Sequence, residues 1–333
     1  MSNMKSRPFV KVISLILSAA VVAVSIWAIL NRQYVLDQLS VWTFQPSAAV
    51  QNISQRTALT QKGELTFYAT RPAIDTRDAF NQACPRQETN SPILGCYTGD
   101  DRIFIYDITN QQLDGIEEVT AVHEMLHAQW KRTSMAKKAT LTTQLEAAYN
   151  SIDDAKLKER MDYYKRTEPG EFVNELHSIL GTEFPNLGSN LESYYGQFFS
   201  REKVLALHNA YNSVYTALYT QADELSSKME ALGTKINSES EAYTAATKQL
   251  SADINSFNTR ASNGSFSSMK EFNTERASLV ARSNALDQQR EIINGDIDTY
   301  NSYYAQYKEV ASQVDALNGS IDSFTQVQQA PSV

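Results

Sequence analysis

The sequence has no cluster of lysine and arginine residues, and its formal net charge is −8. A surface that binds nucleic acid needs a basic patch, so nucleic acid is not expected as a partner. Glycine and proline are also scarce, with 12 and 8 residues. Beyond residue 200 the chain is rich in Ala, Ser, Asn, Gln, Tyr and Leu. We therefore expect two differently built halves that divide near residue 200.

Cysteine is nearly absent, because Cys84 and Cys96 are the only two. Without a second pair they do not predict a cysteine-based metal site. They flank a loop that contains Pro and Asn, and the topology expected below places them where oxidation is possible. A disulfide is therefore predicted, the alternative being two free buried thiols.

One long apolar run, residues 8–30, contains a single charged residue, Lys11. Its length predicts a transmembrane helix. Lys5, Arg7 and Lys11 precede or begin the run and only Arg32 closely follows it, so the positive-inside rule predicts a single-pass cell-membrane protein. Residues 1–7 would be a cytoplasmic tail, 31–46 a linker, and the rest extracytoplasmic. The alternative is a cleaved signal peptide, although no convincing cleavage site follows the run.

Histidine is rare too, yet two of the four histidines lie in the run His123-Glu124-Met125-Leu126-His127. Residues four apart share one face of a helix, so both imidazoles can reach one metal ion, with Glu124 beside a metal-bound water. Asp114 with Glu117 predicts a capping box that begins this helix. The alternative is a surface helix that carries two histidines by chance.

A second helix is predicted after Thr167, which would be its N-cap. Gly181 would lie just past its end. It carries Glu171 and Glu175, one turn apart. A catalytic zinc needs three protein ligands and an open position, and a glutamate from a second helix is a common third ligand. His177, on the same helix, is expected to be structural.

The His-Glu-x-x-His run, followed by a helix with two acidic residues four apart, resembles the gluzincin metallopeptidases, and Tyr164 to Glu175 is similar to the matching segment of the lethal-factor type in that family. The resemblance covers only about residues 113–184. It implies Glu171 as the third zinc ligand and Tyr164 as a catalytic phenol that stabilises the oxyanion. Glu175 would hydrogen-bond to the metal ligands without touching the metal, or would be the third ligand in place of Glu171.

These residues are expected to lie in a small α+β, mostly α, zincin domain over residues 47–200. Helical spacing favours a helix over 47–60, and alternation favours strands over 64–70 and 102–107. Further helices are expected over 141–152 and 155–164.

The remainder, residues 201–327, predicts a long antiparallel coiled-coil hairpin that turns at 262–265 and precedes a disordered tail, 328–333. Apolar residues recur every seven positions in the second arm, beginning with Phe272, Leu279 and Leu286. Residues equidistant from the turn would face each other, including Asp253 with Arg276 and Glu239 with Arg290. The alternative is two straight helices that join different partners in an oligomer.

The leading functional hypothesis is a membrane-anchored endopeptidase with one Zn²⁺ per chain, held by His123, His127 and Glu171. Glu124 would be the general base, acting on a protein or peptide substrate. The rival hypothesis is a catalytically weak or inactive surface scaffold whose hairpin binds a protein partner or the cell envelope.

Overall fold

The computed structural model describes residues 7–84 and 93–323, with side chains from Val12 onward. Apart from the backbone of Arg7, the predicted tails at 1–7 and 328–333 lie outside these ranges. The chain divides into two compact units. Unit 1 comprises residues 1–213 together with 319–333, and unit 2 comprises 214–318.

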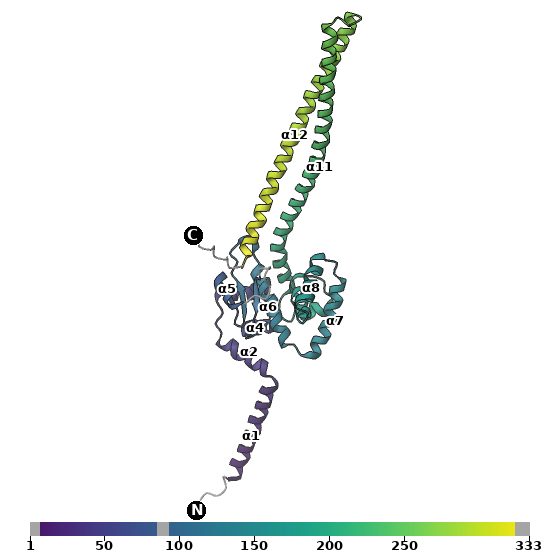
Figure 1. Cartoon of the computed structure of the whole chain (residues 1–333). Helices are drawn as coiled ribbons and strands as arrows, with labels where there is room; N and C mark the ends of the chain where they lie inside the picture. Colours follow the sequence, from purple (N-terminus) through teal and green to yellow (C-terminus); the bar gives the residue numbers. More distant parts are fainter. Residues whose placement is uncertain (1–6, 85–92, 324–333) are drawn as a thin grey trace, which may run out of the picture. The chain divides into compact units, whose positions relative to one another are not determined.

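Unit 1 is mostly helical with one small sheet (Figure 1). Its elements, in chain order, are α1 (Arg7–Leu30), α2 (Arg32–Thr43), α3 (Ala48–Thr57), α4 (Gln61–Ala69), β1 (Ala73–Asp75), α5 (Arg77–Ala83), β2 (Gly95–Tyr97), β3 (Ile103–Tyr106), the short 3₁₀ helix η1 (Gln111–Leu113), α6 (Ile116–Arg132), α7 (Met135–Ser151), α8 (Ala155–Thr167), α9 (Phe172–Glu183) and α10 (Ser189–Tyr195).

The sheet has the order β1-β3-β2 in the described part of the chain. β1 runs parallel to β3 with Ile74 opposite Ile105, and β2 runs antiparallel to β3 with Cys96 opposite Phe104. The strand predicted over 102–107 is thus confirmed as β3. The strand predicted over 64–70 is wrong, because residues 64–69 belong to α4, whose first turn is capped by the Thr60 side chain.

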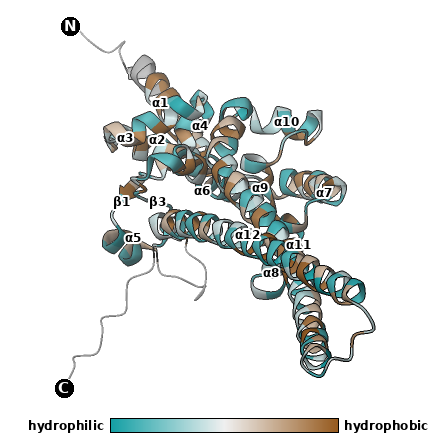
Figure 2. Cartoon of the chain, turned by 90° about the horizontal axis from the view of Figure 1, so that it is seen from above, coloured by the Kyte–Doolittle hydropathy of each residue, from teal (hydrophilic) through white to brown (hydrophobic). Residues whose placement is uncertain are grey.

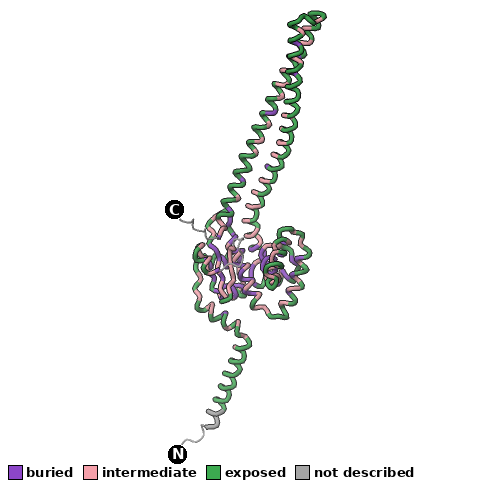
Figure 3. Tube along the Cα trace, viewed as in Figure 1, coloured by how far each residue is buried: buried purple, intermediate pink, exposed green. Residues whose placement is uncertain are grey.

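The core of unit 1 surrounds α6, which packs against α9, α3, α4, β2 and β3. The face of α6 that contributes Val119, Val122, Met125 and Leu126 is buried. Figure 3 shows buried residues gathered in this unit and only scattered along the paired helices. A smaller apolar cluster joins Phe80, Cys84 and Tyr106. The sulfur atoms of Cys84 and Cys96 lie at bonding distance, so the predicted pairing is confirmed.

Helix α1 is long and apolar enough to cross a membrane, with a mean hydropathy of 2.6 over Val12–Leu30 and none of that window buried. Residues 32–43, assigned to a linker from the sequence, instead form α2. This helix packs on α4, and its Asp37 is buried. Arg132, the last residue of α6, binds Asp37 at 2.7 Å and Asp101 at 2.8 Å.

Unit 2 contains most of α11 (Arg201–Ser262) and α12 (Met269–Ile321), the two arms of the predicted hairpin. Along both arms hydrophilic and hydrophobic residues alternate (Figure 2). Leu250, Phe257 and Leu279 form one apolar cluster near the turn, and the Phe257 and Phe272 ring centroids lie 5.0 Å apart. The turn is longer than predicted, since α12 begins only at Met269, and Gly264 has φ +72°.

The predicted polar pairs across the hairpin are wrong. Asp253 binds Arg282 at 2.6 Å rather than Arg276, while Arg290 binds Asp287 of its own helix. Glu239 lies 3.8 Å from Lys235, also on its own helix. These side chains are partly exposed. Their long arginine and lysine members can therefore reach several acidic residues, on the same arm or on the opposite one.

Both ends of the hairpin belong to unit 1. In the first arm Arg201 is buried, where it binds Glu192 at 3.0 Å. At the far end of the second arm, the Ser323 hydroxyl donates to the Ile93 carbonyl at 2.8 Å, and the Asn81 amide donates to the Ser323 carbonyl at 2.7 Å. The hairpin is therefore inserted into unit 1 rather than appended to it.

The apolar contacts predict the register of the hairpin. Cysteines introduced at Ile236 and Ile293 should crosslink readily within one chain under mild oxidation, because the two positions lie at nearly equal distances from the turn. Cysteines at Ile236 and Leu286 should not, since one heptad displaces them by about 10 Å along the axis. Gel mobility with and without reductant measures both variants. Crosslinks found only between chains would contradict the hairpin.

Candidate metal centre

Helix α6 begins without the capping box expected from the sequence. Its N-cap is Gly115, with φ +99°, and no side chain caps it. Asp114 instead binds Arg56 at 2.7 Å, and the Glu117 carboxylate accepts from the Ile108 amide at 2.6 Å. The two acids thus tie α6 to α3 and to the segment after β3 instead of capping the helix.

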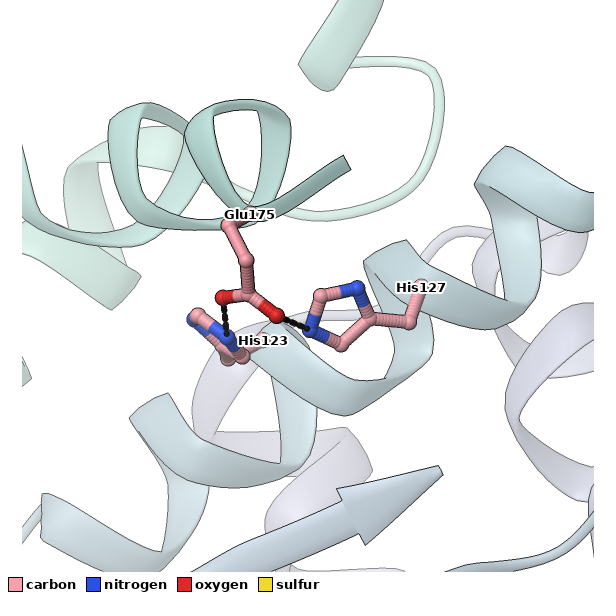
Figure 4. A group of neighbouring side chains, drawn as sticks. All are labelled: His123, His127 and Glu175. Carbon is pink, nitrogen blue, oxygen red and sulfur yellow. Dashed lines mark ion pairs between the residues drawn. The ribbon is translucent and has the colours of Figure 1, made fainter. Parts of the chain in front are cut away.

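The spacing of His123 and His127 places both imidazoles on one face of α6, with ring centroids 4.8 Å apart. Glu175 of α9 lies opposite them (Figure 4). One carboxylate oxygen is 3.6 Å from His123 Nε2 and the other is 3.4 Å from His127 Nε2. One ligand atom from each residue lies within 4.8 Å of the other two. Two imidazole nitrogens and one carboxylate oxygen could therefore hold one metal ion.

Glu171, the third ligand implied by the family resemblance, is not a member of this cluster. The reason is the start of α9. Thr167 ends α8, and α9 begins only at Phe172, so Glu171 precedes the first helical turn. Glu171 is exposed and accepts a hydrogen bond from Asn174 at 2.8 Å. The structure groups Glu175, the alternative ligand, with the histidines.

Gly181 does not end α9, as the sequence suggested, but lies inside it. A Cβ at this position would lie 2.6 Å from Leu126 Cδ1 and 2.7 Å from Tyr195 Cε1. Glycine therefore lets α9 approach α6 closely. This close packing brings Glu175 within reach of His123 and His127.

The charges of the cluster stabilise each other. Burial acts to raise the pKa of Glu175, but the nearby His127 and the hydrogen bond and charge of His123 outweigh burial and lower it to about 2. Burial acts to lower the pKa of His123, yet the hydrogen bond with Glu175 and the charge of Glu124 raise it. A carboxylate held ionised between two imidazoles fits a divalent cation. Nothing in this donor set distinguishes zinc from another divalent ion.

Glu124 is buried on the same helix, beside the histidines. Burial raises the pKa of its carboxyl, while the charges of His127 and His123 and the Tyr97 backbone amide act in the opposite direction. Strand β2 passes very close to this side chain. A Cβ at Gly95 would lie 2.6 Å from Thr120 Cγ2 and 2.8 Å from Glu124 Cγ.

Two further residues of α9, Ser178 and His177, are buried near the cluster. His127 Nδ1 lies 3.4 Å from the hydroxyl of the buried Ser178, which leaves Nε2 directed at Glu175. His177 is fully buried, lies 3.0 Å from the Tyr194 hydroxyl and packs on Trp130. Burial lowers its pKa to about 3, so it is neutral and agrees with the expected structural role.

Helix α8 carries Tyr164, the predicted catalytic phenol. Tyr164 packs edge-to-face on Tyr163, with centroids 5.8 Å apart, and against the main core. Its role at an oxyanion stays a prediction. Arg160, which was not predicted as a site residue, binds Glu183 at 2.7 Å, and its charge helps to lower the pKa of Glu175. This pair joins α8 to the end of α9, and no spacing rule predicts a contact between those positions.

Comparison with protein-family models, with curated proteins and with solved structures finds no match. The chemistry of the site must therefore be inferred from its residues.

The geometry predicts which acid holds the metal. Glu175→Ala should weaken Zn²⁺ binding by more than about 100-fold, beyond the loss typical of an outer-shell partner. Glu171→Ala, the matched control four residues earlier, should bind Zn²⁺ like the unaltered chain because its carboxylate lies outside the cluster. Isothermal titration measures both variants. Loss of binding in Glu171→Ala alone would identify Glu171 as the third ligand.

Proposed function

We propose that the chain is a membrane-anchored, metal-dependent endopeptidase of the gluzincin type, with zinc as its ion. The observation that carries this proposal is the combination of the His123, His127 and Glu175 cluster with a buried Glu124 on the same helix. The donor set leaves room for a catalytic ion with an open coordination position.

When bound, the ion would polarise the scissile carbonyl and lower the pKa of water in the site. Glu124 would accept a proton from the attacking water and deliver it to the leaving amine. Its raised pKa suits both directions of transfer, because a carboxyl that is too acidic would not keep the proton. Tyr164 would donate a hydrogen bond to the developing oxyanion.

Helix α1 would anchor the enzyme, and the residues after it would be extracytoplasmic. The length and apolar character of α1 support the anchor. The basic residues Lys5, Arg7 and Lys11 before or at the start of the apolar run support this orientation. The bonded pair of Cys84 and Cys96 also fits an oxidising compartment. The substrates would be protein or peptide chains on that side of the membrane, and the hairpin would be available to a protein partner.

Replacing Glu124 with Gln tests the mechanism. The amide keeps the size of the side chain and leaves the metal ligands unchanged, but it cannot accept the proton. Turnover of an unstructured protein by the full chain in detergent or lipid should fall by about two orders of magnitude or more, with Zn²⁺ affinity retained. Activity that survives in Glu124→Gln would contradict this mechanism. Metal binding without hydrolysis of any peptide library by the unaltered chain would favour the scaffold.

A second test concerns strand β2. Gly95→Ala places a methyl group against Thr120 and Glu124, so β2 and Glu124 must shift apart. We expect kcat/KM to fall by about 10- to 100-fold, as for a misplaced catalytic group, while Zn²⁺ affinity stays unchanged because the ligands lie on α6 and α9. Gly99→Ala is the matched control, since a Cβ there meets nothing within 4 Å. Equal activity in both variants would show that the position of β2 does not matter to Glu124.

A further inference from the structure

Helix α2 has two unlike faces. Its inner face is fixed to the rest of unit 1 by the buried ion pair of Asp37 with Arg132 and by the Ser40 hydroxyl, which donates to the Ala69 carbonyl at 2.7 Å. Its outer face carries several exposed apolar side chains, with the polar Gln38 among them. Leu36 is 46% exposed, Leu39 is 50% exposed and Trp42 is 84% exposed.

These residues recur at intervals of three, so they form a stripe along one side of α2. Tyr34, 49% exposed, and Trp27 of α1, 51% exposed, lie beside Leu39 and Trp42. The Trp27 and Tyr34 rings pack edge-to-face, with centroids 6.3 Å apart. A hollow of about 390 Å³ lies between them, lined by Trp27, Tyr34, Val35, Gln38, Leu39 and Trp42. We call this surface the α2 outer face.

The position of α2 in the chain, directly after the apolar span, indicates what covers this face. Only Asn31, a non-helical residue, separates the last residue of the apolar span, Leu30, from the first residue of α2. A helix that starts one residue after a span begins in the polar boundary layer of the bilayer, which extends beyond the hydrocarbon core of about 30 Å. Trp and Tyr are the residues enriched in this layer, and leucines reach into the acyl chains below it.

We infer that the α2 outer face binds the outer boundary of the phospholipid bilayer that α1 crosses. This inference rests on the proposed membrane span of α1. With its inner face bonded to Arg132 of α6, α2 would hold the metal-bearing helix at a fixed position relative to the membrane surface. The enzyme would then act on segments of its substrates that lie close to that surface.

Site-directed labelling tests this surface in the full chain. The native cysteines are bonded to each other, so a single new cysteine can carry a bimane fluorophore. The protein is placed at one copy per phosphatidylcholine nanodisc. Leu39→Cys reports on the α2 outer face and Ile29→Cys on the span. Met135→Cys is the matched control, because Met135 is 81% exposed in the same unit but lies on α7.

Quenching by nitroxide-labelled lipid should be at least about threefold stronger at position 39 than at position 135, and aqueous iodide should quench position 39 less. Strong lipid quenching at position 29 with iodide access at position 39 would overturn the inference while leaving the anchor intact. Shielding of position 39 from both quenchers would also overturn it, by showing that protein covers the face. No lipid quenching at position 29 would overturn the membrane span, and the inference with it.

Discussion

The structure of unit 1 depends on the burial of α6, a helix that must carry both the apolar core and a set of ionisable side chains. Its apolar side packs against α9, α3 and the sheet. Its polar side carries His123, Glu124 and His127, which are largely removed from water. An isolated charge in such a place would be costly. Glu175 reduces that cost because it faces both histidines. A bound divalent cation would take the place of the imidazole protons and pair with the same carboxylate. The packing of α6 and the candidate metal centre therefore both depend on Glu175.

A disulfide and a group of ion pairs fix the elements that surround this cluster. The bond between Cys84 and Cys96 fixes the residue next to Gly95, where β2 passes over Glu124. At the other end of α6, Arg132 binds carboxylates from α2 and from the turn before β3. Removing one partner of such a buried pair typically costs about 3–5 kcal/mol, because the other charge is left unpaired. The disulfide thus fixes β2 beside Glu124, and Arg132 fixes α2 to the helix that carries the histidines.

Periodicity and spacing were sufficient to predict the helix that carries both histidines and the hairpin arms. The bonded pair was predicted because Cys84 and Cys96 are the only cysteines and the expected topology allows oxidation. Periodicity and spacing failed where tertiary packing decides the outcome. Alternation of apolar residues over 64–70 suggested a strand, but the Thr60 cap and burial against α6 favour a helix. Glycine at 181 looked like a helix end, whereas its role is close contact between helices. The late start of α9 leaves Glu171 outside the cluster, and the close packing of α9 on α6 brings Glu175 to the histidines. No local pattern reveals either feature.

The central claim is that His123, His127 and Glu175 hold one divalent metal ion. X-ray absorption spectroscopy at the zinc edge, on the full chain loaded with Zn²⁺ and freed of excess metal, measures the ligands directly. We expect one zinc per chain with two imidazole nitrogens and at least one carboxylate oxygen at about 2.0–2.2 Å. Retention of no zinc, or a spectrum without imidazole ligands, would contradict the claim.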